Sequence, residues 1–247
     1  MAAVARTLLV AFVVVLAVLL GLPCLLLWTV LTRRPDFMYG LSMKFCRLAV
    51  RLAGIRVRVE GLESTPPRGC VFAANHASNL DPVLLLSALP RRVSIFAKRE
   101  LFRIPIFSAG MRLAGFIPVD RGGREALAGI ATAVQRLGTG LSLAIFPEGT
   151  RSPDGRVRPF KKGALAIAMD AGVPVVPVSI AGTQRLLPKG NWIIRPGEVI
   201  IRLGPAVDAS GCTPKDRPEL LARLQSLVAA GLPADQQPSQ HAPPQSE

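Results

Sequence analysis

A histidine and an aspartate lie five residues apart in the segment NHASNLDP, residues 75–82, between two apolar stretches. An imidazole that donates one ring nitrogen to a carboxylate keeps a single tautomer, so its other nitrogen can accept a proton. His76 and Asp81 are therefore candidates for a general base and its orienting group. Asp81 as a simple helix cap and His76 bonded to a loop carbonyl are the structural alternatives. We favour catalysis because Asn75 and Ser78 crowd the same strand end, where buried polar groups are costly.

The sequence offers this base no protein nucleophile. There is no GxSxG elbow, no cysteine beside His76 in the chain, and the second histidine, His241, lies in a polar tail. Acidic residues are too sparse for a carboxylate-rich metal site, so we expect neither a metal nor a cofactor. A base without a nucleophile indicates that the substrate brings its own hydroxyl. The pattern predicts direct acyl transfer between two bound substrates.

A second polar cluster, FPEGTRSPDGRVRPFKKGA at 146–164, follows another predicted strand. Its charged residues are Glu148, Arg151, Arg156, Arg158, Lys161 and Lys162, with Asp154 in a Pro-Asp-Gly turn. Lysines at a helix start oppose the helix dipole, and an anion held there would explain them. Converging arginines suit phosphate, and Arg121 in GFIPVDR would join them if the strands are parallel. A solvated basic loop is about equally consistent with the charge run.

Apolar periodicity indicates the elements that must position these residues. Strand patterns lie at 55–60, 69–74, 93–97, 116–119, 141–146, 173–180 and 198–204, and helical patterns at 82–89, 124–138, 161–171 and 217–230. This alternation predicts a single α/β domain at 55–232, with a mixed, largely parallel sheet flanked by helices. Because Asp81 precedes Pro82, we expect it to cap the helix after a 76–80 loop that folds back to His76. The Pro- and Gln-rich tail, 233–247, is predicted to be disordered.

The N-terminal segment 1–34 is predicted to anchor the chain in a membrane. Leu8–Leu31 carry no charge, and about 20 such residues span a hydrocarbon core. A signal peptide would have a shorter apolar region and a small-residue cleavage site, whereas Trp28 and Arg33–Arg34 resemble an interfacial anchor. Gly21 and Pro23 interrupt the run, so a kinked single span and a re-entrant hairpin are both open.

Residues 35–54 predict a basic amphipathic helix after the anchor. Phe37, Leu41, Phe45, Leu48 and Leu52 recur at helical spacing, with Lys44, Arg47 and Arg51 on another face. We favour contact with an anionic membrane over ordinary packing on the domain. We therefore expect the net charge of +14 to serve binding to an anionic membrane. We do not expect nucleic acid as a partner, because aromatic residues make up only 5% of the chain and offer little surface for base stacking. The basic flank predicts a catalytic domain on the cytoplasmic face, and the Ala-, Arg-, Pro- and Gly-rich composition suggests a bacterial inner membrane.

Four motifs in order resemble the 1-acylglycerol-3-phosphate acyltransferase family of membrane glycerolipid acyltransferases. NHASNLD matches its NHxxxxD motif, GFIPVDR its second motif, FPEGTRS its third and VPVVPVSI, with Pro177, its fourth. FAKREL, at 96–101, is similar to a basic segment that follows the first motif. The resemblance covers roughly residues 50–210.

The resemblance implies acyl transfer from acyl-CoA or acyl carrier protein to the sn-2 hydroxyl of a lysophosphatidic acid, giving phosphatidic acid. By analogy His76 would deprotonate the hydroxyl, Asp81 would orient the ring, and backbone donors near the helix start would stabilise the oxyanion. The predicted phosphate and glycerol contacts are Arg121, Glu148, Gly149, Thr150 and Arg151, with Lys98 and Lys162 assisting, and Pro177 lies on the acyl-donor side. Another lysolipid acceptor such as a lyso-ornithine lipid, a thioester hydrolase and a lipid-binding protein without turnover are the alternatives.

Overall fold

Seven strands form one mixed sheet in the computed structural model, which describes residues 1–119, 124–213 and 215–238 (at 124–127 and 162–164 the backbone only). In spatial order they are β1 (Ile55–Glu60), β7 (Gly197–Leu203), β6 (Val175–Ala181), β2 (Val71–Ala74), β5 (Ser142–Ile145), β3 (Val93–Lys98) and β4 (Ile117–Val119). The five strands from β6 to β4 are parallel, and β7 with β1 runs against them. The predicted α/β class and mixed, largely parallel sheet are confirmed, and the seven predicted strands are displaced by at most two residues.

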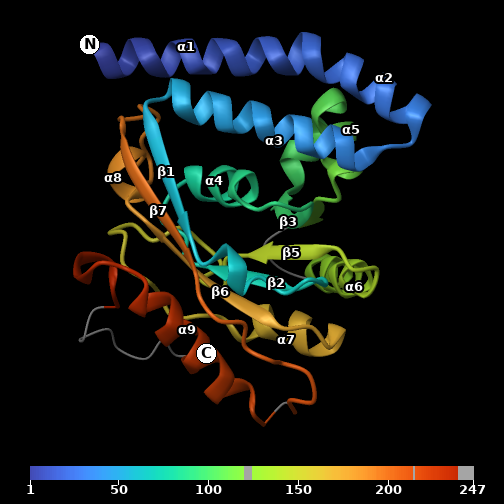
Figure 1. Ribbon diagram of the computed structural model, residues 1–247, viewed down its shortest axis with the longest axis vertical. Coiled ribbons are helices and arrows are strands. Elements are labelled where there is room, and N and C mark those ends of the chain that lie inside the picture. Colours follow the sequence, from blue (N-terminus) through green and yellow to red (C-terminus); the bar gives the residue numbers. More distant parts are fainter. Residues whose placement is uncertain (120–123, 214, 239–247) are drawn as a thin grey trace.

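Helices cover both faces of the sheet, as Figure 1 shows. The two faces of β2 enter separate apolar clusters, because successive side chains of a strand point to opposite sides. Phe72 and Ala74 pack with α3 (Pro35–Leu52) and α4 (Leu80–Ala88), whereas Val71 and Ala73 pack with the second layer of helices. That second layer consists of α6 (Arg124–Gly138), α7 (Lys162–Ala171) and α9 (Arg217–Ala230). β2 is thus buried on both sides, and the residues that follow it lie at the centre of the sheet's edge.

The helix after β2 begins earlier than the sequence predicts. α4 starts at Leu80 with Asn79 as its N-cap residue, so Asp81 lies inside the first turn and its predicted capping position is wrong. Pro82 is tolerated at the third helical position because the first four amides of a helix need no intrahelical acceptor. The Asp81 carboxylate accepts hydrogen bonds from the amides of Ala77 and Ser78 in the preceding loop, whereas a capping residue would accept from amides of the helix.

Four helical segments before α9 were not predicted from the sequence. They are η2 (Leu62–Ser64), η3 (Arg99–Arg103), α5 (Pro105–Ala114) and α8 (Thr183–Leu186). Pro105 at the first turn of α5 and Gly115 after its end, with φ +90°, are recognisable start and stop residues. The helix packs against the N-terminal segment, where Leu22 lies close to Gly110.

The N-terminal apolar run is one continuous helix that passes through α1 (Ala2–Leu16), a π-helical turn η1 (Ala17–Gly21) and α2 (Leu22–Thr32). Pro23 lacks an amide hydrogen and crowds the preceding turn, which accounts for the π turn directly before α2. Within the described residues this is the one helix long and apolar enough to cross a membrane. In Figure 1 it runs across the top of the molecule beside α3.

α3 realises the predicted helix at 35–54 and presents its apolar stripe outward. Phe37, Leu41, Leu48 and Leu52 are all exposed. The core-facing residues are instead Met38, Tyr39 and Val50, on a different side of the helix. α3 therefore packs on the domain and also leaves a large apolar surface uncovered, as the membrane interpretation requires.

The start of the predicted disordered tail is ordered. η4 (Ala234–Gln236) closes onto the domain, and Gln236 is fully buried. Its carbonyl oxygen accepts from the Val157 amide at 2.9 Å, and its side-chain oxygen accepts from the Gly182 amide at 3.0 Å. The composition of the tail could not predict these hydrogen bonds, because their partners lie far away in the chain. The prediction for 233–247 is thus wrong up to Pro238, and the remainder lies outside the described residues.

Candidate functional site

The polar residues singled out in the sequence gather at the carboxyl edge of the parallel strands. Asn75 and His76 follow β2, Phe146 follows the neighbouring β5, and Lys98 ends β3. In open α/β sheets this edge is where loops and helix starts collect reactive groups. Two loops meet there, the His76 loop (residues 75–81) and the glutamate loop (residues 146–152).

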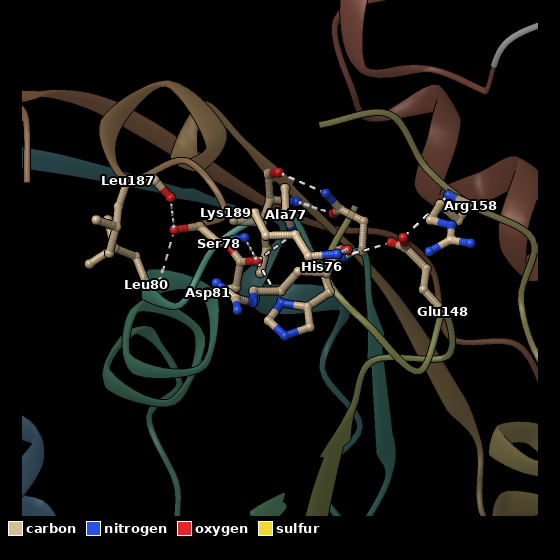
Figure 2. Close-up of polar contacts among 12 residues, drawn as sticks. His76, Ala77, Ser78, Leu80, Asp81, Glu148, Arg158, Leu187 and Lys189 are labelled. Atoms are coloured by element: carbon tan, nitrogen blue, oxygen red, sulfur yellow. Dashed lines mark hydrogen bonds and ion pairs between the residues drawn. The ribbon is translucent and has the colours of Figure 1, made fainter. Parts of the chain in front are cut away.

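His76 and Asp81 are in direct contact, as the sequence predicts. The ring nitrogen Nδ1 lies 2.8 Å from Asp81 Oδ2 (Figure 2). The same oxygen accepts from the amides of Ala77 and Ser78, each at 2.7 Å. The Asp81 side chain is completely buried. A carboxylate fixed by two amides holds the imidazole in one orientation and favours the tautomer that carries its proton on Nδ1.

The imidazole is also held from its face. The Phe146 ring stacks on it with centroids 4.2 Å apart and an interplanar angle of 24°. The His76 side chain is 12% exposed, so part of the ring reaches solvent at the sheet edge. With Nδ1 committed to Asp81, Nε2 is the ring nitrogen available to accept a proton from a bound group.

Two polar side chains secure the His76 loop to distant segments. Asn75 bonds both backbone groups of Ile180 in β6, donating to its carbonyl at 3.0 Å and accepting from its amide at 2.7 Å. The Ser78 hydroxyl donates to the Leu187 carbonyl at 2.8 Å and accepts from the Leu80 amide at 3.2 Å. Both side chains are buried, and these partners offset their desolvation.

The amides at the start of α4 are already engaged. Those of Ala77 and Ser78 donate to Asp81, that of Leu80 donates to Ser78 Oγ, and that of Asp81 donates to the Ser78 carbonyl. None of these four is available for a developing oxyanion without breaking an existing bond. An oxyanion contribution from these amides would therefore require one of these bonds to break, and it stays a prediction.

Glu148 binds the backbone of the neighbouring segments. Its Oε1 accepts from the His76 amide at 2.8 Å and its Oε2 from the Arg158 amide at 3.3 Å (Figure 2). The residue is buried, and burial raises the pKa of its carboxyl from 4.5 to about 7 against the lowering effect of those two amides. Both oxygens thus have protein partners, and direct contact with a substrate stays a prediction.

The glutamate loop is joined to the His76 loop through the backbone. The Ser152 amide donates to the His76 carbonyl at 2.8 Å, so Arg151 directly precedes a residue that is bonded to the histidine. Gly149 has φ +73°, and a Cβ there would lie 3.1–3.2 Å from the Lys161 side chain. Glycine therefore fits both the left-handed backbone and the close approach of Lys161. Arg151 and Thr150 are half-buried in this loop.

The remaining predicted contacts fall into two groups. Lys98 is exposed at the end of β3, on the same sheet edge, and Pro177 is buried in β6 opposite Ala73. Arg121 lies outside the described residues, and Lys162 is described only as the first residue of α7. The structure brings no described group of three or more His, Cys, Asp or Glu side chains into a metal-binding arrangement.

Two residues at the site were missed by sequence reasoning. Phe146, which stacks on the imidazole, is the first residue of FPEGTRS, but nothing in its spacing indicates that contact. Lys189 donates its ammonium to the Arg151 carbonyl at 3.0 Å from a loop well separated in sequence. Both contacts arise from tertiary packing.

The fold and this geometry place the chain among α/β proteins with a His–Asp pair at the carboxyl edge of a sheet. A family model described as acyltransferase matches residues 56–181. Relatives named 1-acyl-sn-glycerol-3-phosphate acyltransferase are 32% identical in Limnanthes alba, over 92% of this chain and 82% of the relative, and 36% identical in Pseudomonas aeruginosa, over 75% and 74%. The crystal structure of the 1-acyl-sn-glycerophosphate acyltransferase PlsC from Thermotoga maritima superposes with a TM-score of 0.83 at 33% identity, covering 92% of this chain and 93% of that one. The chain belongs to the acyltransferase family.

Proposed function

We propose that this enzyme transfers a fatty acyl group from acyl-CoA or acyl carrier protein to the sn-2 hydroxyl of 1-acylglycerol 3-phosphate. The observation that carries the proposal is the 2.8 Å contact between His76 Nδ1 and the buried Asp81. It leaves Nε2 free for proton abstraction at a partly exposed position. The relatives named above, all 1-acyl-sn-glycerol-3-phosphate acyltransferases, support the choice of acceptor.

In the proposed reaction His76 Nε2 takes the proton of the acceptor hydroxyl while its oxygen attacks the thioester carbonyl. The tetrahedral intermediate then expels the thiolate, and the proton on His76 returns to the leaving sulfur. Asp81 stabilises the imidazolium formed between these steps through its contact with Nδ1. The protein supplies position and proton transfer, and no acyl-enzyme is formed.

The acceptor phosphate is proposed to lie against the glutamate loop and the start of α7. Arg151 lies one residue from the Ser152–His76 backbone bond, and Lys161 covers Gly149 in the same loop. Guanidinium and ammonium groups beside a helix N-terminus form a favourable setting for a phosphate. Arg121, Thr150, Lys98 and Lys162 are proposed as further contacts. Glu148 supports this surface by tying the His76 and Arg158 backbones together.

The enzyme is proposed to work at the cytoplasmic face of a bacterial inner membrane. The helix Ala2–Thr32 is about 46 Å long at 1.5 Å per residue, longer than the ~30 Å hydrocarbon core. This helix packs lengthwise beside α3 and contacts α5. Because it stays against the domain along its length, we favour a helix that lies in one leaflet over a helix that crosses the bilayer. The acceptor, a lysolipid, resides in that same leaflet.

An assay with radiolabelled acyl donors and a panel of acceptors tests the proposal. The purified enzyme in mixed micelles should convert 1-acylglycerol 3-phosphate and labelled acyl-CoA or acyl carrier protein into labelled phosphatidic acid. Lyso-ornithine lipid and lysophosphatidylcholine serve as comparison acceptors. Labelled free acid formed without an acceptor would identify a thioester hydrolase, and binding without any product would identify a lipid-binding protein; either outcome contradicts the proposal.

A further inference from the structure

The loop between α8 and β7, residues 187–196, connects the N-terminal helix with the candidate site. At one end the Ile194 amide donates to Thr7 Oγ1 of α1 at 2.9 Å. At the other end the Leu187 carbonyl accepts from Ser78 in the His76 loop at 2.8 Å (Figure 2). Between them Lys189 donates to the Arg151 carbonyl. One short segment thus contacts α1 and both loops of the site.

The tip of the 187–196 loop is held in a defined turn. The Asn191 amide donates to the Pro188 carbonyl at 3.0 Å, and Gly190 between them has φ +88°. Asn191 Oδ1 then accepts from the amides of Trp192 and Ile193 at 2.8 and 2.9 Å. Side-chain bonds of this kind replace regular secondary structure in fixing a backbone. Trp192 is therefore presented by an ordered turn.

Trp192 is 60% exposed although its backbone is fixed. Lys189 and Arg195 in the same loop are also exposed, and the loop contains no acidic residue. An indole among cations suits the headgroup region of an anionic bilayer, where an apolar ring with one polar edge is most stable. Leu8 and Leu9, which follow Thr7 in α1, are exposed as well, so the loop continues the apolar surface of the helix.

We propose that the 187–196 loop is a second membrane-contacting element, with Trp192 inserted into the headgroup region of the anionic bilayer that receives α1 and α2. The inference rests on the membrane attachment proposed above and adds a contact outside the N-terminal segment. Because Leu187 and Lys189 bond the two loops of the site, the loop fixes the height of His76 and Arg151 above the lipid surface. A lysolipid entering from that leaflet would reach them without leaving the membrane.

Tryptophan fluorescence tests the contact directly, because the chain has two tryptophans. In Trp28→Phe protein, Trp192 is the sole reporter. On vesicles of equal parts phosphatidylcholine and phosphatidylglycerol its emission should shift to shorter wavelength and be quenched by brominated acyl chains. As a matched control, Ala222→Trp in a background without either native tryptophan reports from an exposed position of α9, on the opposite side of the sheet from α3. That reporter should be quenched little.

The functional consequence is tested by Trp192→Ala, with Trp192→Phe as the conservative comparison. The alanine variant should bind these vesicles roughly tenfold more weakly and show a similarly raised KM for long-chain acceptor in vesicles. With a short-chain acceptor below its critical micelle concentration, kcat/KM should change by less than about twofold. The phenylalanine variant should recover most of the vesicle affinity.

The outcomes separate this inference from the proposed function. Unshifted, unquenched Trp192 emission on protein that co-sediments with vesicles would overturn the membrane contact. An equal loss of activity on vesicle and monomeric acceptors would also overturn it, because the loop would then support only the site. If the wild-type enzyme transferred no acyl group to any acceptor, the proposed function would fail while quenching still decided the contact.

Discussion

The two loops that meet at His76 use their polar groups differently. In the His76 loop Asn75, Ser78 and Asp81 are buried, and one Asp81 oxygen accepts from the ring and two amides. The glutamate loop buries Glu148 and Ser152, which bond the backbone of His76, and leaves Gly149 exposed and Thr150 and Arg151 half-exposed. The first arrangement fixes a reactive ring, and the second holds a backbone while leaving side chains accessible. The comparison agrees with the proposed roles, in which the His76 loop does the chemistry and the glutamate loop binds the acceptor.

The largest effect is expected for His76→Ala. Removing a general base typically lowers turnover by about 10²–10⁴-fold, and the effect should appear in kcat. The substitution removes a mostly buried ring but leaves Asp81 bonded to the amides of Ala77 and Ser78, so the protein should stay folded. Steady-state kinetics with a thermal unfolding control would test this, and full activity in a folded variant would refute the base assignment.

A smaller kcat effect, about 100-fold, is expected for Asp81→Asn. The imidazole remains, but a neutral amide cannot stabilise the imidazolium and can present a donor instead of an acceptor to Nδ1. The near-isosteric change keeps the buried volume constant. If kcat were unaffected while the unfolding temperature dropped, Asp81 would serve only to order the loop.

Arg151→Ala should act on binding. Losing a charge-assisted contact to phosphate should raise KM for lysophosphatidate roughly ten- to a hundredfold, with a smaller change in kcat. Arg156→Ala is the matched control, because that guanidinium donates to the Gln237 carbonyl at 3.2 Å, away from His76. A larger KM effect from Arg156 than from Arg151 would move the phosphate site out of the glutamate loop.

The smallest expected effect is a pH dependence of stability due to Glu148. Burial raises the pKa of its carboxyl to about 7 from 4.5, so the folded protein holds this proton more tightly than the unfolded chain. That contribution is complete below pH 4.5 and is lost as the pH rises through about 7, by at most about 3 kcal/mol. Urea unfolding in detergent at pH 5 and pH 8 should show a larger fall in the free energy of unfolding for wild type than for Glu148→Gln. Equal falls would mean that Glu148 titrates normally.

Sequence reasoning predicted the central strands well because β2, β5 and β6 are buried along their whole length and carry mostly apolar residues. It was less successful with short segments such as α5, whose ten residues lie between stronger patterns. It also set the helix start after His76 two positions too late, since an Asp-Pro pair suits more than one place in a first turn. Local propensity alone does not decide where such short helices form or at which residue a helix begins, because these depend on hydrogen bonds to other parts of the fold.

The candidate site was predicted in part. The contact of His76 with Asp81 followed from a motif and a loop of suitable length, and the structure confirms the contact. The position of Glu148 between two backbone amides was not predicted, because its partners belong to segments brought together by neighbouring strands. Arg121 and the side chain of Lys162 lie outside the described residues, so their roles stay predictions.

The sequence by itself determined the alternation of strands and helices, the apolar N-terminal helix and the residues able to do acyl-transfer chemistry. These properties depend on composition and short-range spacing, which act within a few turns of the chain. Only the tertiary structure decided which donors each buried carboxylate receives, that Phe146 supports the imidazole, and that the α3 stripe faces outward. Such contacts join residues distant in sequence, and their geometry exists only after the sheet has assembled.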